Sequence, residues 1–71
     1  MEDLDRVEEE IRRRHADWSF IERQPAKIKA ALEFYIKFGD EYKAAKLANL
    51  TLDAFEDLRI KARIPKVVWR S

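Results

Sequence analysis

The 71-residue chain contains no cysteine, one histidine, one glycine and two prolines. Without cysteine, neither a disulfide framework nor a thiolate metal site can form. A single histidine, His15, makes a poor metal site, and the spacing of the hydroxyl side chains builds no pair of nucleophile and base. There is also no glycine-rich phosphate loop. The sequence therefore predicts a protein that is not an enzyme and has no cofactor or metal, with His15 on the surface or in a helix seam.

Long apolar runs are also missing. No stretch approaches the ~18 residues that a membrane span needs, and the opening Met1-Glu2-Asp3 does not resemble a signal peptide. These absences predict a cytoplasmic protein without membrane contact. Amides are scarce, with only Gln24 and Asn49, whereas lysine, arginine and glutamate are abundant. That bias is typical of thermophile proteins.

Charge is plentiful and unevenly distributed in a composition that predicts one globular domain over residues 1–71. Charged residues make up 41% of the chain and apolar residues 46%. The net charge is −5 over residues 1–10, +4 over 11–30, −3 over 31–58 and +5 over 59–71. Alternating acidic and basic blocks of this kind suggest a partner that recognises charge, although the overall charge of +1 does not.

Residues 1–18 predict a charged N-terminal helix with a narrow apolar stripe, formed by Leu4, Val7, Ile11 and Trp18. Such a stripe fits either a helix lying on its own domain or the seam of a homodimer, and we expect a homodimer. Ser19 followed by Glu22 reads as a capping box, so a joint is predicted at residues 19–24.

Residues 25–38 predict a central helix, because apolar side chains cover most of its circumference. Gly39 is placed to end that helix in a left-handed conformation, and Asp40 to cap the next one. A third helix over 41–48 and a fourth from the cap Thr51 to about Ala62 complete the core. The expected fold is therefore all-α, with four helices and a short basic, β-prone tail over residues 65–71.

The stretch EYKAAKLANLTLDAFEDL, residues 41–58, meets the demands of a helix-turn-helix. Two closely crossing helices need a small residue at their contact, a residue tolerant of positive φ in the turn, and apolar residues that anchor the second helix. These positions are held in order by Ala45, Asn49, Leu50, Phe55 and Leu58. The sequence thus predicts a helix-turn-helix core over residues 25–64.

The segment ALEFYIKFGDEYKAAKLANLTLDAFEDLRIKARIP resembles the small prokaryotic helix-turn-helix antitoxin family. The resemblance covers about residues 31–66 and is carried by Ala44, Ala45, Leu47, Ala48, Leu50, Phe55, Leu58, Ile64 and Pro65. It implies a role in transcription regulation or toxin neutralisation, with a ribonuclease toxin as a partner.

The candidate partner is double-stranded DNA. The residues expected to hold it, mostly through phosphates, are Lys43, Lys46, Thr51, Arg59, Lys61 and Arg63. The outward face of the fourth helix also carries Asp53, Glu56 and Asp57, which phosphates repel. The alternative is a protein–protein adaptor or toxin-neutralising module without DNA binding. Its contact surface would be Ile60 and the tail residues Val67, Val68 and Trp69.

Overall fold

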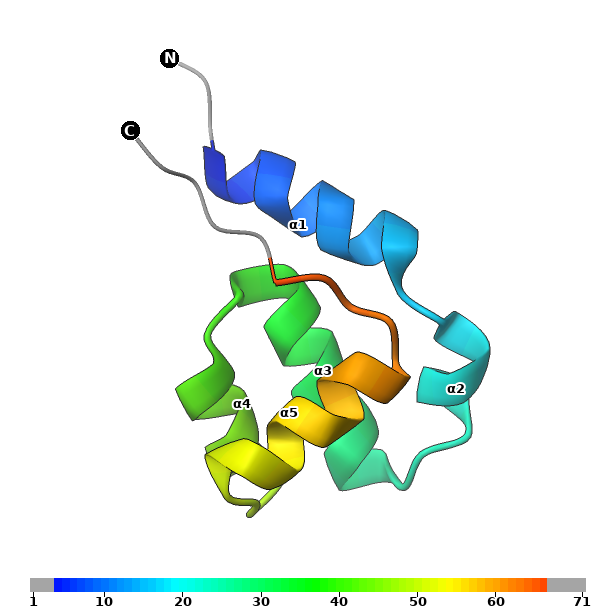
Figure 1. Cartoon of the computed structure of the whole chain (residues 1–71), viewed down its shortest axis with the longest axis vertical. Coiled ribbons are helices and arrows are strands. Elements are labelled where there is room, and N and C mark those ends of the chain that lie inside the picture. Colours follow the sequence, from blue (N-terminus) through cyan, green and yellow to red (C-terminus); the bar gives the residue numbers. More distant parts are fainter. Residues whose placement is uncertain (1–3, 67–71) are drawn as a thin grey trace.

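A computed structural model describes residues 4–66, and within that range the chain is all-α without a strand. The helices are α1 (Leu4–His15), α2 (Trp18–Glu22), α3 (Ala26–Phe38), α4 (Glu41–Leu47) and α5 (Leu52–Lys61). α3 is the central element, because α1, α2 and α4 all pack against it, and α5 packs on α4 (Figure 1). The predicted central position of residues 25–38 is therefore confirmed. The β-prone part of the tail falls on Val67, Val68 and Trp69, which lie outside the described residues.

The described range contains five helices, so the predicted count of four is wrong. The extra helix is α2, and its N-cap is Asp17, whose carboxylate accepts a hydrogen bond from the Phe20 backbone N–H at 3.1 Å. The capping box at Ser19 and Glu22 is not formed. Asp17 is extended, and its N–H donates to the Ala62 carbonyl at 2.7 Å. This bond to the end of α5 separates α1 from α2, and local sequence gives no sign of it.

The predicted helix caps around α4 are confirmed. Gly39 ends α3 at φ 69°, and its N–H donates to the Tyr35 carbonyl at 2.7 Å. The Asp40 carboxylate accepts from the Lys43 N–H, and the Thr51 hydroxyl accepts from the Ala54 N–H. Each side chain satisfies one of the free N–H groups that open a helix. The bounds of α4 and α5 follow from these local bonds.

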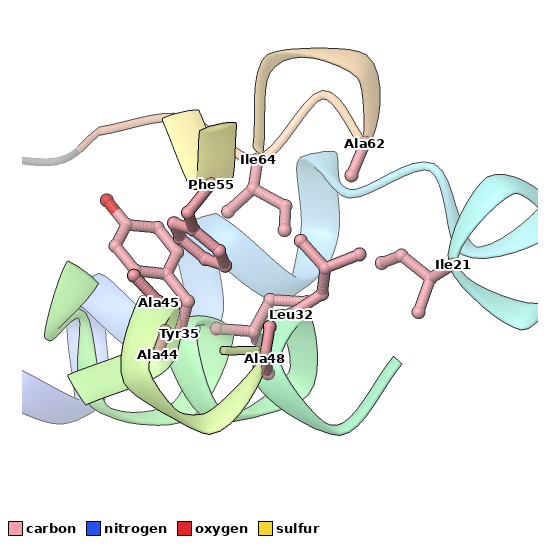
Figure 2. Packing of buried hydrophobic residues seen from close by; sticks show 11 residues of the cluster. Ile21, Leu32, Tyr35, Ala44, Ala45, Ala48, Phe55, Ala62 and Ile64 are labelled. Carbon is pink, nitrogen blue, oxygen red and sulfur yellow. The ribbon is translucent and has the colours of Figure 1, made fainter. Parts of the chain in front are cut away.

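The core lies between α3 and the α4–α5 pair, with α2 closing one side. Phe55 is fully buried, and its ring meets the Tyr35 ring edge-on at 5.7 Å between centroids (Figure 2). Burying a phenylalanine stabilises the fold by about 2–3 kcal/mol. Ile21 from α2 is also fully buried, and Trp18 and Phe20 pack partly buried beside it, so this segment returns to the core.

The contact between α1 and α3 depends on a buried arginine. Arg12 is only 3% exposed, and its guanidinium donates to the carbonyls of Ile36 at 2.7 Å and Lys37 at 3.4 Å. These carbonyls belong to the last turn of α3, where no N–H of the helix itself can reach them. The guanidinium carbon also lies 5.8 Å from the centre of the Tyr35 ring. α1 therefore lies on its own domain, one of the two arrangements its stripe allowed, and a homodimer stays a prediction.

Candidate nucleic-acid interface

The turn between α4 and α5 is short because small side chains let the two helices meet. Ala44, Ala45 and Ala48 are buried, and Asn49 takes the left-handed conformation at φ 57°, as predicted. The Leu50 N–H then donates back to the Ala45 carbonyl at 2.9 Å. This reversal sets the start of α5 beside the end of α4 (Figure 1).

Two of the predicted phosphate contacts come together on α4. Lys43 and Lys46 are both exposed, and they line one surface hollow with Phe34 and Leu47. Within residues 4–66 neither lysine makes an ion pair. Their ammonium groups are therefore available to an anionic ligand.

Lys61 and Arg63 form a second pair of exposed cations, at the C-terminal end of α5. Neither has a carboxylate within ion-pair distance in the described part of the chain. Arg63 has φ 59°, a strained value for a residue with a side chain. Thr51 lies at the opposite end of α5, where its exposed hydroxyl accepts the cap bond and keeps its own proton for donation. α5 has ten residues and is about 15 Å long, so Thr51 lies about that far from the cations at the other end of the helix.

Arg59 differs from the other predicted cations because its partners are internal. Its Nη2 and Nε atoms donate to Glu56 Oε1 at 2.7 and 3.1 Å, and Nη1 donates to the Ile64 carbonyl at 2.8 Å. The side chain is only 12% exposed. Here Arg59 fastens the segment after α5 to the helix.

The outward acids of α5 are not equivalent. Asp53 and Asp57 are exposed, whereas Glu56 turns toward Arg59 and lies 3.5 Å from the Lys66 ammonium. A hydrogen bond from the Glu41 carboxyl, together with Arg59, lowers the pKa of Glu56 to about 2. The Glu56 carboxylate is therefore charged but compensated by Arg59 and Lys66. Of the three acids, only Asp53 and Asp57 present uncompensated negative charge on this face of α5.

Glu41, at the start of α4, forms the other half of this carboxyl pair. Its Oε1 atom is buried and has no hydrogen-bond partner. A partner exists only when the Glu41 carboxyl is protonated and donates a hydrogen bond to the Glu56 carboxylate. The hydrogen bond to Glu56 and burial both raise the pKa of Glu41, while Lys66 at 3.4 Å opposes that shift. Sequence reasoning missed this cluster because its members lie on α4, α5 and the following segment. Only their packing brings them together.

Sequence reasoning also missed an apolar surface beside Lys43 and Lys46. Phe38 is 60% exposed and Leu47 is 49% exposed, although the apolar circumference of α3 predicted packing on several sides. α1, α2 and α4 leave the last turn of α3 partly uncovered, because Gly39 and Asp40 turn the chain away there.

No protein-family model, curated protein or solved structure matches this chain. The resemblance to helix-turn-helix antitoxins therefore stays a prediction, and any function has to be argued from the geometry. None of the helices over residues 4–66 is long and apolar enough to cross a membrane.

Proposed function

We propose that this domain binds double-stranded DNA, with α4 and α5 acting as a helix-turn-helix, and that it serves in transcription regulation. The observation that supports the proposal is a set of exposed cations on α4 and at the C-terminal end of α5 that make no ion pair within residues 4–66. Lys43 and Lys46 lie on α4, before the turn, and Lys61 and Arg63 lie at the far end of α5. Cations on both helices of the pair could contact phosphates at more than one point of a duplex.

The dimensions suit the major groove of B-DNA. That groove is about 12 Å wide and admits an α-helix, whose diameter with side chains is about 10–12 Å. With α5 in the groove, the cations of α4 and of the α5 end would meet phosphates, while Thr51 at the start of α5 would donate to a phosphate or a base edge. Glu56 would not oppose this approach, since its charge is held by Arg59 and Lys66.

Asp53 and Asp57 would face the groove itself. A carboxylate there can accept a hydrogen bond only from a cytosine amino group, and phosphates repel it. Binding would therefore depend mainly on backbone contacts and vary little with sequence. A homodimer would double those contacts, and the resemblance to antitoxins implies an added toxin-neutralising role.

The test measures affinity for a random-sequence duplex over a series of salt concentrations. The logarithm of the association constant should fall steeply with the logarithm of salt, since each phosphate contact contributes about −0.9 to that slope. The double variant K43A/K46A should reduce the slope by about 2, if both lysines reach phosphates. Arg63→Gly should weaken DNA binding while relieving the left-handed backbone strain at φ 59°. A lower DNA affinity of this variant could therefore not be attributed to unfolding.

Arg14→Ala is the control, because Arg14 is also an exposed arginine but belongs to α1, outside the proposed helix-turn-helix. Its affinity and salt slope should match those of the wild type. Failure to bind the duplex even at low salt would overturn the proposal. So would equal losses in R14A and K43A/K46A, because binding would then reflect general charge.

The second candidate function, a protein–protein adaptor, is favoured by the exposed apolar surface beside Lys43 and Lys46. That surface has its own geometry and its own test.

A further inference from the structure

An apolar groove runs along the surface where the end of α3 meets α4. We call it the α3–α4 groove, and its residues are Phe34, Phe38, Asp40, Lys43, Lys46 and Leu47. It consists of two open hollows of about 270 and 350 Å³ that share Phe34 and Lys43. The rings of Phe34 and Phe38 pack together with centroids 4.8 Å apart. Two adjoining hollows suit two successive apolar side chains of one ligand.

The rim of the groove is positive. Lys43 borders both hollows, Lys46 borders one, and the Lys37 ammonium lies 5.6 Å from the centre of the Phe38 ring. Asp40 is the one acid among the lining residues, and its carboxylate already accepts the N-cap bond from the Lys43 backbone. Within residues 4–66 the three lysines make no ion pair. An occupant with carboxylates beside its apolar side chains would complement this rim.

We propose that the α3–α4 groove binds an acidic amphipathic helix of a partner protein. Apolar side chains one turn apart on such a helix would enter the two hollows, as helices do in the grooves of other binding domains. Aspartates and glutamates beside them would pair with Lys43, Lys46 and Lys37. A duplex would satisfy the lysines but would leave Phe38 and Leu47 without an apolar partner.

The proposal does not depend on DNA binding, but the two ligands would share Lys43 and Lys46. Each ligand would therefore exclude the other. The apolar residues separate the two functions, because Phe38 and Leu47 would contribute to helix binding and not to phosphate contact.

The experiment uses the full chain and a fluorescent synthetic peptide of about 15 residues, with leucines at helical i, i+4 and i+7 spacing and glutamates and aspartates beside them. Fluorescence anisotropy gives the affinity, and amide chemical shifts locate the site. We expect micromolar binding, with shifts concentrated in residues 34–47. F38A/L47A should weaken binding by more than about tenfold, since the loss of one well-packed apolar contact already costs about tenfold and this variant removes two.

Ile60→Ala is the comparison variant, because Ile60 on α5 is as exposed as Phe38, lies outside the groove, and belongs to the other adaptor surface predicted from the sequence. It should leave the peptide affinity unchanged. F38A/L47A should also keep the salt-dependent DNA affinity of the wild type, so that loss of peptide binding is distinguished from loss of DNA binding and from unfolding.

Four results would overturn the proposal. The first is no binding of the acidic peptide, and the second is equal binding of a peptide in which lysines replace its acids. The third is a chemical-shift pattern centred away from the groove. The fourth is preferential binding to anionic phosphatidylglycerol vesicles with the same dependence on Phe38 and Leu47, which would assign the surface to a lipid membrane.

Discussion

Replacing Arg12 by alanine should be the most damaging single change in α1. The substitution removes the guanidinium that donates to the Ile36 and Lys37 carbonyls, so that the buried Ile36 acceptor and the partly buried Lys37 acceptor lose this donor. It also removes a positive charge from the C-terminal end of α3, where the helix dipole is negative. Because α1 packs mainly against α3, α1 should lose its attachment.

The size of the effect follows from these contacts. A hydrogen bond from a charged donor contributes about 1.5–3 kcal/mol, and a charge at a helix end adds about 0.3–1 kcal/mol. We therefore expect R12A to lower the free energy of unfolding by about 3 kcal/mol. A domain of this size has only about 4–10 kcal/mol in total. R12K should lose less, since it keeps the charge but lacks the planar fork that reaches two carbonyls.

Urea unfolding followed by circular dichroism measures these differences, with unfolding midpoint and slope fitted separately. Arg13→Ala is the control, because Arg13 is 51% exposed and its side-chain contacts are surface ones, to Glu9 at 2.7 Å and to the Trp18 ring at 5.9 Å. Its loss should stay below about 0.5 kcal/mol. A loss for R12A no larger than that for R13A would refute the assignment of Arg12 as the attachment of α1.

Three further predictions concern pH and the helix ends. The raised pKa of Glu41 means that its stabilising contribution, present below the ordinary value of 4.5, is lost as pH rises through the folded-state pKa. E41Q should therefore lack that decline and be more stable than the wild type at neutral pH. E56Q should be less stable than the wild type at neutral pH, because the stabilising contribution of the Glu56 carboxylate is lost only when the pH falls toward its pKa of about 2. Urea unfolding across a pH series checks both predictions. Gly39→Ala should cost about 2 kcal/mol in the same assay, because φ is 69° and the added Cβ would lie 2.9 Å from Arg12 Nη1. Thr51→Ala should cost about 1 kcal/mol by removing the cap of α5, and a loss near zero would show that water replaces the hydroxyl.

The parts of the fold that the sequence predicted correctly are those set by local chemistry. Four turn and cap residues act on the backbone within four positions of themselves, so their roles could be predicted directly from the sequence. They are Gly39, Asp40, Asn49 and Thr51. α2 was missed although its N-cap Asp17 is a local signal, because Ser19 and Glu22 were interpreted as the cap instead. The separation of α2 from α1 also depends on the bond between the Asp17 N–H and the distant Ala62 carbonyl. No periodicity in residues 1–22 contains that information.

The candidate site was predictable only where it depends on residue type and helical spacing, and not where it depends on packing. The exposed cations Lys43, Lys46, Lys61 and Arg63 could be proposed because charge and helical spacing are visible in the sequence. The internal bonds of Arg59 were not visible, since one of its acceptors is the carbonyl of Ile64, which returns to the core through the left-handed turn at Arg63. The exposure of Phe38 was not visible either, because periodicity shows only which side chains of residues 25–38 are apolar. It does not show that the chain turns away after α3 and leaves its last turn partly uncovered.

The closeness of Arg12 to Gly39 also limits how this sequence can diverge. Asparagine tolerates a left-handed backbone better than most residues with a side chain, but at position 39 its Cβ would still meet the guanidinium. A descendant that loses Gly39 must therefore give up or shift Arg12, and with it the attachment of α1. Conversely, a descendant without Arg12 is free to place a side chain at position 39, provided that it tolerates the left-handed backbone. These two positions, one on α1 and one at the end of α3, should therefore vary as a pair during evolution.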